Sequence, residues 1–189
     1  GAGVTHMHPG GRYAYTMEAT PREGMGGTAC QIGQFAVTDT TSDTVVDQVA
    51  VKYKGATCTD ALAMDEDTNE PGYYRFSKDG NTMFVSISGG FMDATARVRY
   101  TAVFDTTDPA APVQLASIPT ATQTEHGWIT RDGTGQHVYV VGSIDGAVSE
   151  IDTTTKQVTR TLPVGANPLV LGTYGTAEGG SEQVGPVND

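Results

Sequence analysis

The chain has 189 residues and a formal net charge of −11 with only 11 Lys plus Arg, which argues against nucleic acid and anionic membrane surfaces as partners. No apolar run approaches the roughly 18 residues of a membrane span, and no apolar pattern at helical spacing is sustained. The 24 glycines, with many Thr, Val and Asp, suit short strands and tight turns, so we expect one all-β domain with its own core.

Two patterns recur along the chain in the same order. The first is a short apolar strand, a small polar turn that ends in glycine, and an aromatic-rich strand. Its copies lie at residues 3–17, 73–87 and 127–141, aligned on Gly11, Gly80 and Gly133. The second is a strand that ends in Asp-Thr-Thr, a turn and an outgoing strand. Its triplets are residues 39–41, 105–107 and 152–154. Together the patterns predict three repeats of one four-stranded antiparallel unit.

The third unit, from Trp128 to Pro168, resembles the YVTN-type β-propeller repeat. The pattern of that family is PxxIxxSPDGxxxYVxN, followed by a strand and IDTxTxxVxxTIxVGxxP. The matching stretches here read GWITRDGTGQHVYVV and IDTTTKQVTRTLPVGANP. The resemblance is looser in the first two units. It implies four-stranded blades around a central channel, and it implies no single activity, because propellers serve both as binding modules and as enzymes.

The repeats predict an all-β, partial β-propeller over residues 1–174. We expect blades at about 3–52, 72–118 and 126–164, one extra inner strand at 168–173, and a polar tail or linker at 175–189. Propellers usually close with four to eight blades, and an open arc of three leaves unpaired edges. We therefore expect the arc to belong to a larger propeller of about seven blades, completed by remaining blades or by a protein partner.

The connections between strands divide unevenly between the two faces of the predicted disc. If the strands of each blade are A to D from the channel outward, the A–B and C–D turns are tight and share one face. The long connections all fall on the other face: 18–29, 55–71, 91–96 and 119–125. Long loops on a rigid scaffold often carry function. The leading hypothesis is an exported β-propeller binding or scaffold protein, whose long-loop face engages a protein or small-molecule partner.

Cys30 and Cys58 are the two cysteines of the chain. Cys30 precedes strand C and Cys58 follows strand D of the first blade, so both are expected at the same end of one hairpin. A disulfide between them is physically reasonable and is compatible with a periplasmic or extracellular location. The alternative is two separate buried thiols.

Three histidines define the alternative function. His6 and His8 alternate within the first inner strand, and His126 stands at the start of the third inner strand, so all three are expected on the channel side. Imidazoles from several inner strands could bind copper or another transition metal, as in a metal-dependent propeller oxidoreductase. The other interpretation is histidines that form hydrogen bonds in a polar channel. A lactonase-like hydrolase would need channel carboxylates that the inner strands do not supply.

An acidic segment supplies a second candidate metal site. Asp65, Asp67 and Asn69 match the first three ligands of a calcium loop. The pattern then departs, because Glu70 stands where the loop needs Gly and Phe76 where it needs a bidentate Glu. The alternative is a solvated acidic loop. No nucleophile motif, P-loop, dinucleotide fingerprint or CxxCH motif occurs, so whether the protein is an enzyme stays open.

Overall fold

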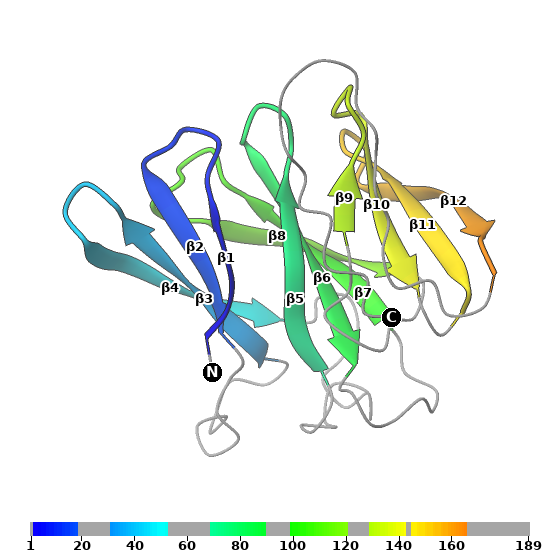
Figure 1. The fold of residues 1–189 in the computed structure, drawn as a ribbon, viewed down its shortest axis with the longest axis horizontal. Helices are drawn as coiled ribbons and strands as arrows, with labels where there is room; N and C mark the ends of the chain where they lie inside the picture. The colour runs from blue at the N-terminus through cyan, green and yellow to red at the C-terminus, as the bar shows by residue number, and fades with distance from the viewer. Residues whose placement is uncertain are drawn as a thin grey trace, which may run out of the picture.

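The computed structural model describes residues 2–18, 31–52, 69–89, 99–120, 129–142 and 145–165. Every element in these ranges is a β-strand, and the strands form three antiparallel four-stranded sheets in which sequential strands are neighbours. We call the sheets blades 1 to 3. Figure 1 shows them side by side, with blade 2 between blades 1 and 3.

The strand bounds follow the predicted repeats closely. Blade 1 contains β1 (Ala2–Met7), β2 (Tyr13–Glu18), β3 (Gln31–Asp39) and β4 (Thr44–Lys52). Blade 2 contains β5 (Asn69–Phe76), β6 (Thr82–Gly89), β7 (Arg99–Asp105) and β8 (Val113–Thr120). Blade 3 contains β9 (Ile129–Arg131), β10 (His137–Gly142), β11 (Ala147–Asp152) and β12 (Gln157–Pro163). The expected class, all-β with three four-stranded blades, is confirmed. The predicted inner strand at 168–173 and the tail at 175–189 lie outside the described residues.

A glycine with positive φ closes the turn between the first two strands of every blade. The three φ angles are +76° at Gly11, +77° at Gly80 and +77° at Gly135. Each glycine N–H donates to the carbonyl three residues earlier, on His8, Ser77 and Asp132 respectively. The sequence alignment on Gly133 was therefore wrong by two residues, because Asp132-Gly133 has the composition of a turn but Gly135 adopts the left-handed conformation.

The Asp-Thr-Thr triplets join the two tight turns within each blade. The first threonine donates its backbone N–H to the turn between the first two strands: Thr40 to Arg12, Thr106 to Asn81 and Thr153 to Gln136. Its hydroxyl donates to a carbonyl of the same turn, on Arg12, Gly80 and Gly135 respectively. The aspartate accepts N–H groups of its own turn, as Asp39 does from Thr41. The triplet thus supplies hydrogen-bond partners for the backbone N–H and carbonyl groups of both turns, which explains why it recurs in every blade.

The core lies between the blades, not within one sheet. Side chains of a strand alternate between the two faces of its sheet, so blade 2 is buried on both sides. Toward blade 1 it presents Tyr74, Met83, Val85 and Phe104, which pack with Tyr15 and Phe35. Toward blade 3 it presents Phe84, Val103 and Ile118, which pack with Ile129, Val138 and Val140. Stacking of neighbours therefore buries apolar faces that one blade alone would expose.

Candidate functional site

The two edges of the arc differ in how the chain connects its strands. The turns between β1 and β2, β5 and β6, and β9 and β10 lie together at one edge (Figure 1). The turns that carry the Asp-Thr-Thr triplets form hydrogen bonds with these turns and therefore lie at the same edge. The strand ends that adjoin residues 19–30, 53–68, 90–98 and 121–128 therefore lie at the opposite edge, as predicted from the antiparallel order. We call these the turn edge and the loop edge.

His6 and His8 face blade 2. The ring of His6 lies edge-on to the ring of Tyr74, with centroids 4.9 Å apart. The ring of His8 lies edge-on to the ring of Phe76, with centroids 5.1 Å apart. Both aromatic residues belong to β5, the first strand of the next blade. The imidazoles contact the next blade because side chains stand perpendicular to a sheet whose faces cover the neighbouring blades, and their expected place at a central channel stays a prediction.

Both ring nitrogens of His8 are engaged by backbone groups. The Gly10 N–H donates to Nδ1 at 3.0 Å, and Nε2 lies 2.9 Å from the carbonyl oxygen of Gly80. Because Nδ1 accepts, Nε2 must carry the proton that it donates to Gly80. In this arrangement the ring has no lone pair left for a metal ion. His8 connects the turn of blade 1 to the turn of blade 2.

Tyr74 forms the corresponding contact beside His6. Its hydroxyl accepts the backbone N–H of His6 at 2.6 Å and donates to the carbonyl of Tyr15. His6 and Tyr15 are paired residues of β1 and β2, so the phenol bridges two backbone groups of one strand pair. Burial raises the pKa of Tyr74, so the hydroxyl keeps its proton and can donate. Tyr15 in turn donates to the Pro109 carbonyl of blade 2 at 2.7 Å.

Most of the other predicted site residues lie outside the described residues. These are His126, Cys30, Cys58, Asp65 and Asp67, so the calcium site, the disulfide and the three-histidine set stay predictions. Asn69 is the first residue of β5 and pairs with Gly89. Among the described residues, no group of three or more His, Cys, Asp or Glu side chains is arranged to hold a metal ion. Within the same ranges, no helix is long and apolar enough to cross a membrane.

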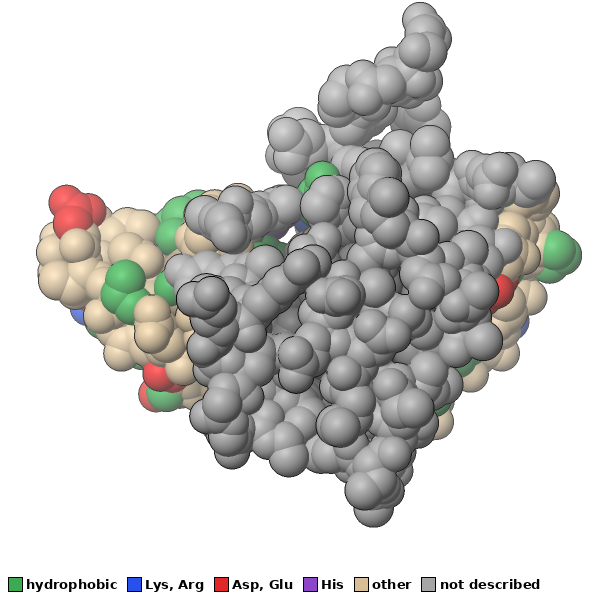
Figure 2. All heavy atoms as spheres, turned by 90° about the horizontal axis from the view of Figure 1, so that it is seen from below, with side chains coloured by type: hydrophobic (Ala, Val, Ile, Leu, Met, Phe, Trp, Pro, Cys, Tyr) green, Lys and Arg blue, Asp and Glu red, His purple; other side chains and the backbone are tan. Residues whose placement is uncertain are grey.

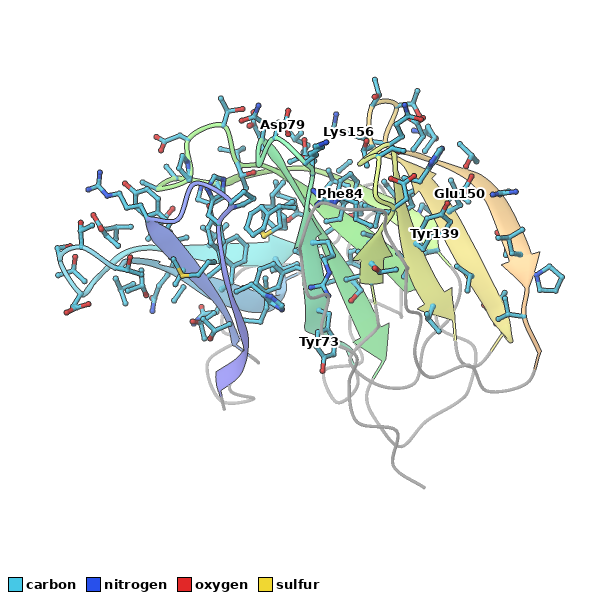
Figure 3. The ribbon with its side chains drawn as sticks, turned by 45° about the horizontal axis from the view of Figure 1, so that its top comes forward. Tyr73, Asp79, Phe84, Tyr139, Glu150 and Lys156 are labelled. Carbon is cyan, nitrogen blue, oxygen red and sulfur yellow. The ribbon has the colours of Figure 1, made fainter. Side chains whose placement is uncertain are left out.

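The structure reveals a polar cluster on blade 3 that sequence reasoning missed. The carboxylate of Glu150 accepts from Arg160 at 2.6 and 2.8 Å and from the hydroxyl of Thr159 at 2.8 Å. The side chain of Glu150 is 7% exposed and that of Arg160 is 59% exposed. Tyr139 is paired with Glu150 across β10 and β11, and Figure 3 labels both residues on blade 3. The cluster covers the turn-edge half of the blade 3 face that points away from blade 2.

The electrostatics of this cluster follow from its hydrogen bonds. The Arg160 guanidinium holds the pKa of Glu150 below its usual range, so the carboxylate is charged. Burial raises the pKa of Tyr139, and its hydrogen bond to Glu150 raises that pKa further. Equivalent strand positions, matched through the shared turns, carry Val37 in blade 1 and Val103 in blade 2. The alignment on the Asp-Thr-Thr triplets already places these three residues two positions before each aspartate, so the sequence contained this exchange of valine for glutamate.

A similar ion pair stabilises the turn edge of blade 1. Arg12 Nη2 lies 2.6 Å from Oδ2 of Asp39, and Thr41 donates to the other carboxylate oxygen from both its N–H and its hydroxyl. The hydrogen bond from Arg12 is the main reason that the pKa of Asp39 lies far below its usual range. This carboxylate is therefore occupied by its own turn. Asp105 and Asp152 accept N–H groups in the same way, which lowers the pKa of each.

Among the described residues, the exposed large apolar side chains are distributed over several strands. Val45 and Val46 of β4, and Val113 and Leu115 of β8, are exposed on outer strands. Figure 2 shows the hydrophobic side chains of blade 1, at the left, separated by polar groups. Scattered apolar residues are normal on protein surfaces and mark no site.

Comparison with known proteins supports the fold. No protein-family model matches the sequence, and no curated protein matches it. Among solved structures, a hydrazine synthase of Kuenenia stuttgartiensis superposes with a TM-score of 0.57 at 10% identity, covering 87% of this chain and 50% of the other. A periplasmic gluconolactonase of Pseudomonas aeruginosa gives 0.56 at 16% identity, covering 88% and 40%. The β-propeller domain of a Myceliophteria thermophila protein gives 0.51 at 14% identity, covering 88% and 43%.

The chain has a β-propeller fold. It spans at most half of the length of these structural neighbours. At such identities the likeness concerns the fold alone, so the neighbours do not choose between a binding protein and an enzyme. The propeller implied by the YVTN resemblance is confirmed, whereas no family model supports that repeat family itself.

Proposed function

We propose that this chain is part of an exported β-propeller that acts as a binding or scaffold protein and engages its partner through the loop edge. The observation that carries the proposal is the division of connections. All tight turns of the first and last strand pairs lie at the turn edge, and the four longer connections attach at the loop edge. Binding residues of rigid scaffolds concentrate on such connections.

The chemistry of the turn edge supports the same choice. Its aspartates and threonines are used within the turns themselves, as in the contacts of Asp39, Asp105 and Asp152 with nearby N–H groups. Polar groups that already have partners gain little from a ligand, because binding would only exchange one hydrogen bond for another. The turn edge is therefore built for stability, and the loop edge is the better candidate for recognition.

A capture experiment with matched variants tests the proposal. In the loop-edge variant, residues 92–96 and 121–125 are replaced by Gly-Ser sequence of equal length. In the turn-edge variant, Ser42→Lys, Gly133→Lys and Thr154→Lys change exposed residues. Each chain is immobilised and incubated with an extract of the source organism, and captured proteins are quantified by mass spectrometry.

The expected result is a partner whose capture falls at least about tenfold with the loop-edge variant and is unchanged with the turn-edge variant, a loss of roughly 1.4 kcal/mol of binding free energy or more. Loss of the partner with the turn-edge variant alone, or no captured partner, would contradict the proposal. Export is tested separately through the Cys30–Cys58 disulfide, which an oxidising compartment would allow. If the disulfide is present, the intact mass of the chain is two hydrogens lower before reduction than after it.

A further inference from the structure

The two described interfaces between blades are built in the same way. The first strand of each blade lies against the blade before it, and β5 contacts β1, β2 and β3 of blade 1. Within each of these first strands, the residue three positions before the start of the shared turn (Ser77 or Asp132) faces the preceding blade: Tyr74 in β5 and Ile129 in β9. The forward face of each blade is thus the site that receives the next first strand.

The forward face of blade 3 shares two apolar positions with the receiving face of blade 1, whereas the same positions of blade 2 hold the buried polar residues Ser86 and Thr101. Matched through the shared turns and strand registers, Val141 and Val148 occupy the positions that Met17 and Phe35 hold in blade 1. Val140, which precedes Val141 in the sequence, lies on the opposite face of the sheet and packs in the core with blade 2. Val141 and Val148 are 2% and 3% exposed, although blade 2 lies on the opposite side of the sheet. Such burial is expected of a face that receives a further segment.

The chain beyond Gly165 contains a segment that suits this face. Residues 168–173, PLVLGT, follow β12 just as β5 follows β4 and β9 follows β8. The PxxI pattern places Leu171 at the position of Ile129 and Tyr74, which both face the preceding blade. Alternation along a strand then puts Leu169 on the same side as Leu171, and Val170 on the opposite side.

We propose that residues 168–173 form the first strand of a fourth blade, which packs on the forward face of blade 3 through Leu169 and Leu171. The contact is with Val141 and Val148, on the loop-edge half of that face. The turn-edge half carries Glu150 where blades 1 and 2 have valine, and Glu150 is bound by Arg160, so the apolar contact is concentrated where the new strand begins. The arc therefore continues beyond blade 3.

Three chain lengths test this proposal: residues 1–165, 1–174 and 1–189. We expect the chain 1–174 to melt within about 2 °C of the full chain. The chain 1–165 should melt roughly 5–10 °C lower, because it exposes Val141 and Val148 and loses the two leucines that cover them. Amide hydrogen exchange at β10 and β11 should also be faster in the chain 1–165 than in the full chain.

Two point variants in the full chain keep the test decisive if the shortened chain fails to fold. Leu171→Asp should lower the melting temperature by several degrees, because it places a charge against Val148. Val170→Asp is the matched control and should change it by about 2 °C or less. Equal melting temperatures for residues 1–165 and 1–189, or a larger effect of Val170→Asp than of Leu171→Asp, would overturn the proposal. Partner capture plays no part in these measurements, so this inference and the proposed function can fail separately.

Discussion

Tyr74→Phe is the most direct test of how blades 1 and 2 are joined. The substitution keeps the aromatic ring, which is 1% exposed and packs against Phe76 and His6, and it removes only the hydroxyl. That hydroxyl accepts from the His6 N–H at 2.6 Å and donates to the Tyr15 carbonyl. Both backbone groups would lose this partner in a buried place that water does not easily reach.

The expected cost follows from these two hydrogen bonds. A typical hydrogen bond contributes about 0.5–1.5 kcal/mol, and a buried group left without a partner costs about 1–3 kcal/mol. We therefore expect Tyr74→Phe to lower the free energy of unfolding by about 2 kcal/mol, which corresponds to a fall of roughly 4–8 °C in the melting temperature for a chain of this size.

Urea unfolding followed by circular dichroism measures this change directly, and amide exchange at His6 reports the local effect. Tyr13→Phe is the control, because Tyr13 is only partly buried and its ring contact with Arg12 survives the substitution. The control should stay within about 0.5 kcal/mol of the parent chain. If Tyr74→Phe also stays within 0.5 kcal/mol, the bridge does not contribute to the joining of the blades and the reasoning is refuted.

Three further predictions rest on other features of the fold. Gly135→Ala should lower the free energy of unfolding, measured in urea, more than Gly11→Ala does. At both positions a positive φ costs an alanine roughly 1–2 kcal/mol. Only at Gly135 would the added Cβ also lie 2.7 Å from Cβ of Lys78. Equal losses would show that the contact between turns is not tight. Phe84→Ala should cost about 3–5 kcal/mol because its ring is fully buried between blades 2 and 3, whereas exposed Val46→Ala should cost less than about 0.5 kcal/mol; a small effect at Phe84 in calorimetry would contradict the assigned core. Finally, stability should fall as pH drops below about 4, because Asp39, Asp105 and Glu150 have pKa values below their usual range and the unfolded chain then binds more protons than the folded one. A urea midpoint that is constant between pH 6 and 3 would exclude this linkage, and Asp39→Asn should weaken the pH dependence.

Local signals made the blades predictable from the sequence. The Asp-Thr-Thr triplets and turn glycines act through hydrogen bonds within a few residues, and strand alternation has a fixed period of two. These signals located all three sheets and separated the turn edge from the loop edge. The turn of blade 3 was misplaced, because Gly133 and Gly135 have the same composition signal. Only the hydrogen bond from Gly135 to Asp132 distinguishes them.

The sequence by itself determined the repeating unit, the number of described blades and the edge from which the longer connections leave, because each depends on short-range chemistry. Only the tertiary structure decided what the side chains of each face meet. It turned His6 and His8 toward Tyr74 and Phe76 of the next blade. It also brought Arg160 and Thr159 onto the carboxylate of Glu150. The physical reason is that the direction of a side chain is local, whereas its neighbour is set by how the sheets stack around the axis.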